Sequence, residues 1–182
     1  MIFQETKLPG AHVILPQRLE DERGFFALTW RAGDFEQRGL TSKLVQCNIS
    51  FNTRKGTLRG MHYQAAPAEQ CKLVRCTMGA IYDVIIDLRE DSPTYREWIG
   101  VELTAENRQM LFIPEGFAHG FQALRDGSEV FYQIGGAAYA PDRERGVRWN
   151  DPAFAIQWPS EVTVISPRDA AYPDFEPSIR KG

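Results

Sequence analysis

The stretch KGTLRGMHYQ, from Lys55 to Gln64, is basic, punctuated by glycine and otherwise typical of a β-strand. Side chains alternate between the two faces of a strand, so residues two apart share a face. One face of this strand would carry Leu58, Gly60, His62 and Gln64. Arg59 would point to the opposite face. The sequence therefore predicts a strand that presents His62 as its single imidazole.

Short apolar segments of the same kind recur on both sides of this stretch, rich in β-branched or aromatic residues and separated by Gly, Pro, Asp or Asn. They are HVILP (12–16), FFALTW (25–30), KLVQCNISF (43–51), KLVRCTM (72–78), AIYDVIIDL (80–88), MLFIP (110–114), EVFYQI (129–134) and VTVIS (162–166). This spacing predicts an all-β sandwich or barrel. We expect only short helices, one in RAGDFEQRGL (31–40) capped by Asp34 and ending at Gly39, and a weaker one in TAENRQM (104–110). The tail from Pro167 is expected to pack on the domain.

Composition limits the number of domains, the partners and the location. With 182 residues, 43% of them hydrophobic, the chain is predicted to form one domain over residues 1–182. Its 21 basic and 24 acidic residues give a net charge of -3, so no broad basic field is available to hold nucleic acid or a membrane surface. Cys47, Cys71 and Cys76 form no CxxC pair, which argues against a disulfide framework and a zinc site. The N-terminal stretch does not resemble a signal peptide, and we expect a cytoplasmic protein.

A second histidine, His119, lies in FIPEGFAHGF (112–121), behind a tight Pro-Glu-Gly turn. This segment and the stretch around His62 resemble the two signature motifs of the cupins, a family of β jelly rolls. The resemblance implies that both histidines face one barrel interior. Metal-binding cupins continue the first motif as His-x-His, but here the second histidine is replaced by Gln64. Because glutamine is a poor ligand for metals that favour imidazole, His62 is expected to be available for proton chemistry.

Further segments extend the resemblance over nearly the whole chain. In order they are DERGFF (21–26), QCNIS (46–50), KGTLRGMHYQ, KLVRC (72–76), GAIYDVIIDLREDSPTY (79–95), FIPEGFAHGF, RGVRWNDP (145–152) and SPRD (166–169). This order resembles the dTDP-4-dehydrorhamnose 3,5-epimerase family. The resemblance implies an all-β, cupin-type β jelly-roll barrel with a few short helices, and a homodimer with N-terminal strands extended across the interface. It implies an isomerase that inverts C3 and/or C5 of a 4-keto-6-deoxyhexose carried on a nucleoside diphosphate, namely dTDP. The reaction would belong to dTDP-L-rhamnose or related deoxysugar biosynthesis. No metal or redox cofactor is expected.

The chemistry of such an inversion defines the catalytic groups. A hydrogen beside a ketone is removed by a base, the enolate oxygen needs a cation, and an acid must stand on the opposite face of the ring. By resemblance His62 is the base and Asp169 is the carboxylate that orients it. The resemblance also implies that Lys72 is the cation and Tyr132 the acid.

The resemblance implies a substrate-binding set as well. It consists of Arg23 on the phosphates or sugar, Gln46 and Asn48 on polar edges, Arg59 on the diphosphate, Lys72 at the keto oxygen, His119 as a hydrogen-bond donor, Tyr139 stacked on the base, and Glu144 and Arg168 nearby. Since strand alternation separates Arg59 from His62, both reach one ligand only with a bulge at Gly60 or a contribution across a dimer interface. Leu28, where many members have glutamate, and a longer segment before Tyr139 depart from the family pattern and leave the nucleotide base open.

Two other classes of function are compatible with the sequence. A metal-dependent cupin oxygenase or isomerase would need His62, Glu69 and His119 to share iron or manganese. A non-catalytic sugar-nucleotide binding protein would bind its ligand without hydrogen exchange. Within the enzyme class, inversion of C3 alone or C5 alone and an aldose-ketose isomerization are further alternatives.

Overall fold

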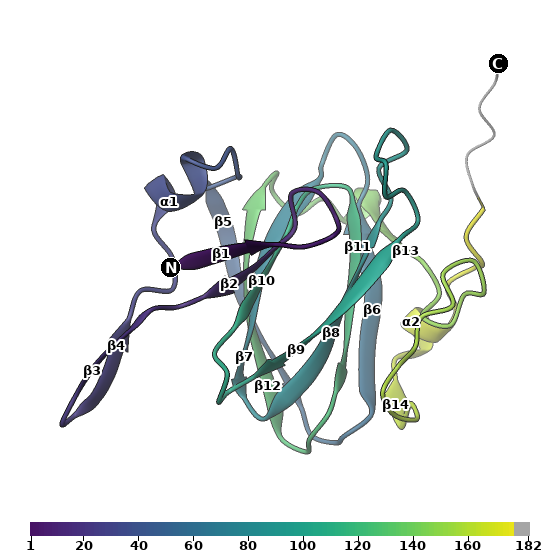
Figure 1. The fold of residues 1–182 in the computed structure, drawn as a ribbon. Coiled ribbons are helices and arrows are strands. Elements are labelled where there is room, and N and C mark those ends of the chain that lie inside the picture. Colours follow the sequence, from purple (N-terminus) through teal and green to yellow (C-terminus); the bar gives the residue numbers. More distant parts are fainter. Residues whose placement is uncertain (177–182) are drawn as a thin grey trace.

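A computed structural model describes residues 1–176, and most of its strands form two antiparallel sheets (Figure 1). The first sheet has the order β1 (Ile2–Glu5), β2 (His12–Leu15), β10 (Met110–Ile113), β7 (Gln70–Met78), β12 (Ser128–Gly136) and β5 (Leu44–Asn52). The second has the order β13 (Glu144–Gly146), β6 (Thr57–Gln64), β11 (Phe117–Ala123), β8 (Ala80–Asp87) and β9 (Trp98–Thr104), and β14 (Val164–Ile165) pairs with β6 in parallel. The chain crosses repeatedly between the two sheets, which gives the jelly-roll barrel that the sequence predicts.

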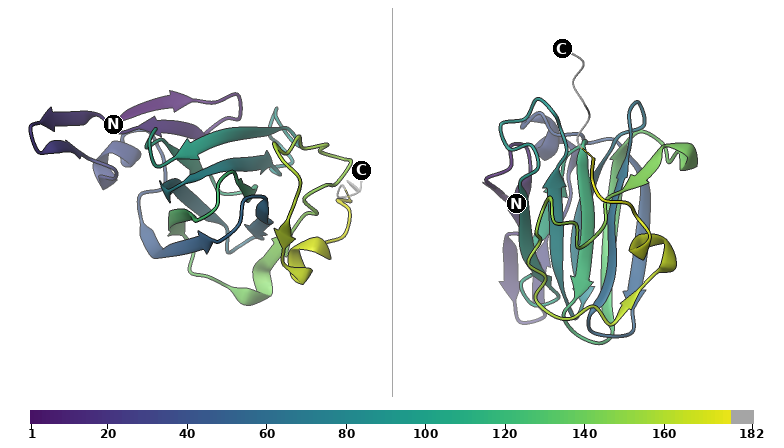
Figure 2. Two further views of the ribbon diagram at one scale, coloured as in Figure 1. Left: turned by 90° about the horizontal axis from the view of Figure 1, so that it is seen from below. Right: turned by 90° about the vertical axis from the view of Figure 1, so that its right-hand side faces the viewer.

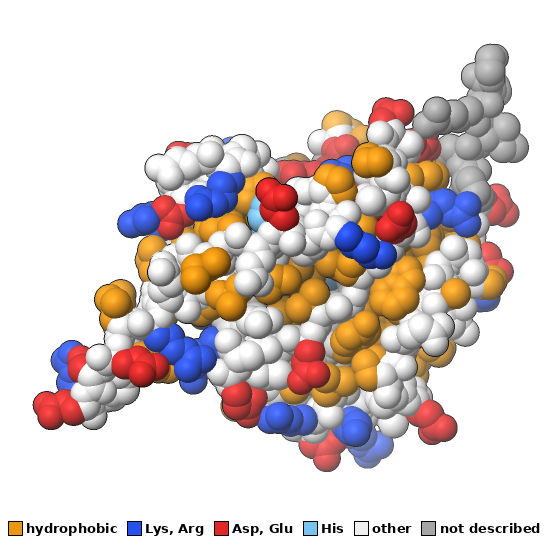
Figure 3. Space-filling model, in the orientation of Figure 1, with side chains coloured by type: hydrophobic (Ala, Val, Ile, Leu, Met, Phe, Trp, Pro, Cys, Tyr) orange, Lys and Arg blue, Asp and Glu red, His pale blue; other side chains and the backbone are white. Residues whose placement is uncertain are grey.

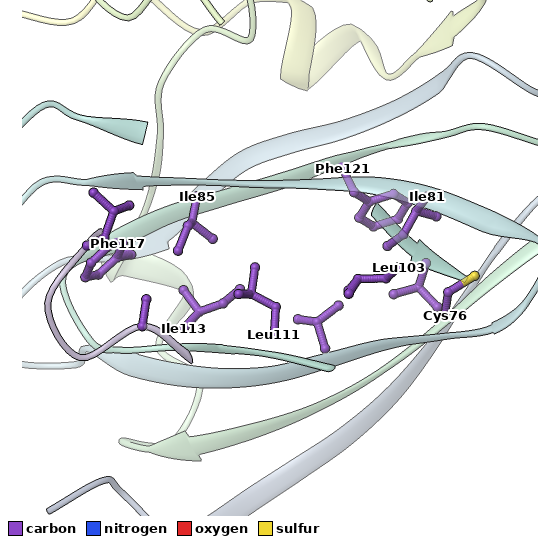
Figure 4. Close-up of a cluster of buried hydrophobic side chains, with 12 residues drawn as sticks. Cys76, Ile81, Ile85, Leu103, Leu111, Ile113, Phe117 and Phe121 are labelled. Atoms are coloured by element: carbon purple, nitrogen blue, oxygen red, sulfur yellow. The ribbon is translucent and has the colours of Figure 1, made fainter. Parts of the chain in front are cut away.

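The barrel interior is filled by apolar side chains from both sheets (Figure 4). Ile81 and Ile85 of β8 meet Leu111 of β10 in this core, and none of the three is exposed. Inward and outward positions alternate along β8. The position between the two isoleucines therefore also faces the core, and it holds the carboxylate of Asp83, which is 0% exposed.

The C-terminal segment covers the outer face of the second sheet (Figure 2). Val84 and Ile86 of β8 pack against Phe154 and Phe175 there, so the described part of the tail, up to residue 176, packs on the barrel as expected. The segment includes helix α2 (Pro167–Ala170), whose first turn is capped by the Ser166 hydroxyl. Packing of this segment brings α2 against the edge of the barrel at β6.

The outer face of the first sheet is covered only in part. Helix α1 (Ala32–Glu36) places Phe35 against Phe3 and Phe112 at one end of this face. On the edge strand β5, Ile49 and Phe51 are 65% and 52% exposed. A hairpin of β3 (Arg18–Asp21) and β4 (Gly24–Ala27) extends away from the barrel in both Figure 1 and Figure 2. The uncovered strand face and the extended hairpin are available to a second molecule.

Two expectations for the helices are wrong in detail. Asp34 does not cap α1, because the N-cap residue is Arg31 and Asp34 lies within the first turn, where it pairs with that arginine. The segment TAENRQM forms a turn before β10, not a helix. Its Thr104 hydroxyl and Asn107 amide accept backbone N–H bonds, and such local bonds compete with helical ones.

Positive and negative side chains are interspersed on the face shown in Figure 3, so this face has no broad basic field. Among the described residues, no helix combines the length and apolar character needed to cross a membrane. A short 3₁₀ helix, η1 (Pro141–Arg143), leads into β13 and completes the described elements.

Candidate active site

A cleft lies between the two sheets and consists of two neighbouring cavities, of about 420 Å³ and 180 Å³. Three side chains line both cavities, namely His62 of β6, Lys72 of β7 and Tyr132 of β12. These residues therefore lie where the cavities meet. A concave site with a few converging polar groups is the usual form of a small-molecule site.

The His62 imidazole is held by a carboxylate. Its Nε2 lies 2.8 Å from Asp169 Oδ1, and the backbone N–H of Gly60 donates to the other oxygen, Oδ2, at 3.1 Å. Burial would raise the pKa of Asp169, but the hydrogen bonds from His62 and Gly60 outweigh it, so this pKa lies below its ordinary value. An ionised carboxylate only accepts hydrogen bonds, so in the neutral imidazole Nε2 carries the proton and Nδ1 has a lone pair. His62 is thus oriented as a base.

A bulge in β6 allows Arg59 and His62 to line the same cavity. The three-residue step from Arg59 to His62 is matched by a two-residue step from Phe121 to His119 on β11. Gly60, in the middle, has a φ of +137°, and a Cβ there would lie 2.5 Å from a Cα of β11. Only glycine fits such a position. The bulge expected at Gly60 is therefore present, and a single chain brings both side chains to the larger cavity.

Lys72 extends from the first sheet toward a buried histidine and carboxylate on the second. Its Nζ lies 3.4 Å from His119 Nδ1, and His119 Nε2 lies 2.7 Å from Asp83 Oδ1. Burial lowers the pKa of Lys72 to about 8, against the opposing effect of Asp83 and Glu144. Burial, with the charge of Lys72, also lowers the pKa of His119, which is therefore neutral near pH 7.

His119 lines the larger cavity, and both of its ring nitrogens have partners within the protein. Because the Asp83 carboxylate accepts a hydrogen bond from the Nε2–H group, Nδ1 of the neutral imidazole is left as an acceptor for Lys72. His119 then has no N–H group free to donate to a ligand. Asp83 itself was not among the expected site residues. The available signal was the one acid inside the apolar run AIYDVII (80–86), at an inward position of the strand.

Tyr132 lies on the wall opposite His62, since β12 belongs to the first sheet and β6 to the second. Burial raises the pKa of Tyr132, with Arg59 opposing the shift, so the phenol keeps its proton at neutral pH. The cleft thus has an imidazole on one wall, a phenol on the other and the Lys72 ammonium between the sheets.

The other expected binding residues divide between the cavities. Gln46, Asn48, Tyr139 and Glu144 line the smaller cavity, and Arg59 and Arg168 line the larger one. The Tyr139 hydroxyl donates to Glu144 at 2.6 Å, and Arg168 pairs with the other oxygen of the same carboxylate. Tyr139 is 51% exposed, so its side chain is accessible to a ligand.

Arg23 is the one expected binding residue that the structure does not bring to the cleft of its own chain. It lies at the tip of the β3–β4 hairpin, where it pairs with Asp21, and it lines neither cavity. Leu28 directly follows this hairpin and also lines neither cavity. Both residues are therefore outside the site of a single chain.

The set required for a metal-dependent cupin is not gathered. Glu69 lines neither cavity, while His62 and His119 each direct Nε2 to a separate aspartate. Among residues 1–176, no three His, Cys, Asp or Glu side chains are grouped to hold a metal ion. Gln64 is instead buried, and its side-chain oxygen accepts the backbone N–H of Ala140 at 3.3 Å.

Comparisons with known proteins find relatives that match nearly the whole chain. The family model for dTDP-4-dehydrorhamnose 3,5-epimerase matches residues 5–177. A curated dTDP-4-dehydrorhamnose 3,5-epimerase from Methanothermobacter thermautotrophicus is 46% identical over 170 residues, which cover 92% of this chain and 90% of the relative. The crystal structure of the Bacillus anthracis enzyme of that name, with TDP and PPi bound, has a TM-score of 0.91 and 40% identity, covering 96% of this chain and 99% of that one. A Legionella pneumophila epimerase in complex with dTDP-4-keto-L-rhamnose has a TM-score of 0.87 and 39% identity, covering 94% and 90%.

Proposed function

Because the chain belongs to the dTDP-4-dehydrorhamnose 3,5-epimerase family, we propose that it is an isomerase that inverts C3 and C5 of a dTDP-linked 4-keto-6-deoxyhexose. The observation that carries the proposal is the cleft itself. His62 with Asp169 stands on one wall, Tyr132 on the other, and the Lys72 ammonium between the sheets. The reaction belongs to dTDP-L-rhamnose or related deoxysugar biosynthesis.

In the proposed mechanism the unprotonated Nδ1 of His62 removes the proton from a carbon beside the 4-keto group. The two electrons of the C–H bond form the enolate, and its oxygen is stabilised by the Lys72 ammonium. Asp169 stabilises the imidazolium that results. C3 and C5 both neighbour the same ketone, so one set of groups serves both carbons.

Inversion then requires a proton from the opposite face of the ring. Tyr132 fits this role, because its raised pKa keeps the phenol protonated and its strand belongs to the sheet opposite His62. The proton leaves the phenol oxygen for the enolate carbon, which leaves a tyrosinate and an imidazolium. His62 then releases its proton to solvent and the tyrosinate takes one up, so both groups are restored before the second carbon reacts. The cycle needs no electron donor or acceptor.

The nucleotide is proposed to lie along the smaller cavity and the arginines. Gln46 and Asn48 offer amide groups for a pyrimidine, and the accessible side chain of Tyr139 offers a stacking surface. Arg59 presents a guanidinium in the larger cavity that suits a diphosphate.

We further propose that the protein is a homodimer in the cytoplasm. Arg23 can bind substrate only if the β3–β4 hairpin reaches the cleft of a second copy, and the hairpin extends away from its own barrel (Figure 2). The exposed Ile49 and Phe51 form part of an apolar face that a second copy would cover. Sedimentation at micromolar concentration tests this: a dimer is expected, and a monomer would contradict it.

The function is tested by NMR of dTDP-4-keto-6-deoxyglucose in heavy water. The enzyme should incorporate deuterium at C3 and C5 and yield the inverted sugar. Incorporation at one carbon would identify a single-carbon epimerase, and binding without incorporation would identify a binding protein.

Variants of the two proton carriers separate their roles. His62→Asn should abolish both deuterium uptake and inversion, with a loss of about 10²-fold to 10⁴-fold. Tyr132→Phe should still exchange the ring hydrogen but return it to the same face, so exchange outpaces inversion. A Tyr132→Phe enzyme that inverts at the wild-type rate would show that another group is the acid.

A further inference from the structure

A buried carboxylate lies behind the catalytic lysine, outside both cavities. Resting on the proposed function, we propose that Asp83 is a positioning residue: acting through His119, it keeps the Lys72 ammonium charged and directed at the enolate oxygen. The three groups form one hydrogen-bonded row from β8 through β11 to β7, with spacings of 2.7 Å and 3.4 Å.

Packing alone does not explain why a carboxylate occupies position 83. It is 0% exposed between Ile81 and Ile85, and its Oδ2 has no hydrogen-bond partner among the described residues. A carboxylate in an apolar core destabilises the fold unless it is well paired. An apolar residue would suit this core position better, so the acid is expected to serve the site.

The first role of Asp83 is to fix the tautomer of His119. A neutral imidazole carries one proton, and the acceptor-only carboxylate holds it on Nε2. Nδ1 is then an acceptor and can take a hydrogen bond from the Lys72 ammonium. With the proton on Nδ1 instead, two donors would face each other and Lys72 would be displaced.

The second role is electrostatic. The titratable groups around Lys72 come from five elements: Asp83 (β8), His119 (β11), His62 (β6), Tyr132 (β12) and Glu144 (β13). Burial lowers the pKa of Lys72, while Asp83 and Glu144 oppose this shift. Since Asp83 favours the charged lysine, its removal should cause the ammonium to lose its proton at a lower pH.

The test is the pH dependence of kcat for Asp83→Asn. Activity should fall on the alkaline side as Lys72 loses its proton, and in the variant this fall should occur about one pH unit lower, with up to about a tenfold loss at alkaline pH. Asp87→Asn is a matched control. Asp87 is equally buried on the same strand, but it accepts bonds from Arg89, Ser92 and Thr94. That control should lose stability without moving the alkaline fall.

The outcomes distinguish a failure of the proposed function from a failure of the proposed role of Asp83. An inactive wild-type enzyme would contradict the proposed function, whereas active enzymes with the same alkaline fall in wild type and Asp83→Asn would overturn the role of Asp83. If Asp83→Asn does not fold, ¹⁵N-histidine NMR of the wild type gives the answer. The row requires His119 protonated at Nε2 and bare at Nδ1 across neutral pH, and a proton on Nδ1 would refute it.

Discussion

Replacement of Lys72 by methionine should make the protein more stable while it removes activity. Burial lowers the pKa of Lys72 from 10.5 to about 8, a difference of about 2.5 units. At 1.36 kcal/mol per unit, the charged lysine costs the folded state about 3 kcal/mol near neutral pH. Loss of the contact between Lys72 and His119 offsets about 1 kcal/mol. Lys72→Met should therefore raise the free energy of unfolding by about 2 kcal/mol.

The stability gained by Lys72→Met should decrease as the pH rises. Below pH 8, Lys72 is charged in both the folded and the unfolded state, so its full cost is present. Between about 8 and 10.5 the folded state releases the proton while the unfolded chain retains it, and the cost disappears. The advantage of Lys72→Met should thus be greatest near neutral pH and decline as pH rises through this interval.

Urea unfolding of wild type and Lys72→Met at neutral pH and near pH 10.5 measures the gain directly. Lys43→Met provides the control, because Lys43 is exposed and its removal should give no comparable gain. A Lys72→Met protein that is less stable than wild type would refute the reasoning. A gain equal at both pH values would show that the buried charge is not its cause.

Three further outcomes are expected. Asp169→Asn should reduce kcat by at least about 10²-fold, because the His62 imidazole loses the negative charge that orients it and stabilises its protonated form. Stopped-assay kinetics with dTDP-4-keto-6-deoxyglucose measure this loss. Activity should survive dialysis against EDTA, and complete loss restored by iron or manganese would overturn the assignment of His62 as a base. Leu28 should make selection of the nucleotide less sharp, by about 0.5 to 1.5 kcal/mol relative to Leu28→Glu, because leucine cannot accept a hydrogen bond from the ligand. Calorimetry of both proteins with dTDP, UDP, GDP and CDP measures this, and a very strong thymidine preference in the wild type would make Leu28 irrelevant.

Much of the barrel follows from local patterns, because alternating apolar residues between turn residues identify strands without reference to the rest of the chain. The turn at Thr104 could not be predicted in this way, because the same polar residues are compatible with a helical period and with a turn held by side-chain hydrogen bonds. The contact between His62 and Asp169 joins positions 107 residues apart, and only the resemblance to a family could suggest it.

The surroundings of Asp83 could not be predicted from the sequence pattern. Asp83 interrupts the apolar run AIYDVII (80–86), and the pattern alone does not reveal whether it meets solvent or a partner inside the barrel. Its partner, His119, comes from another strand, and the tautomer of that histidine depends on the contact. The bulge at Gly60 could be expected, because Arg59 and His62 had to reach one ligand from positions that alternation separates.

The division of the cleft into two cavities has a consequence for inhibitors. His62, Lys72 and Tyr132 are accessible from either cavity, so a small fragment that occupies only the 180 Å³ cavity would touch all three without imitating the sugar. A second fragment could occupy the 420 Å³ cavity beside Arg59 and Arg168. Joining the two fragments with a short linker would make the second binding event intramolecular and increase affinity beyond that of either fragment. The three side chains shared by the cavities thus mark the point at which to join two fragments that each compete with a different part of the substrate.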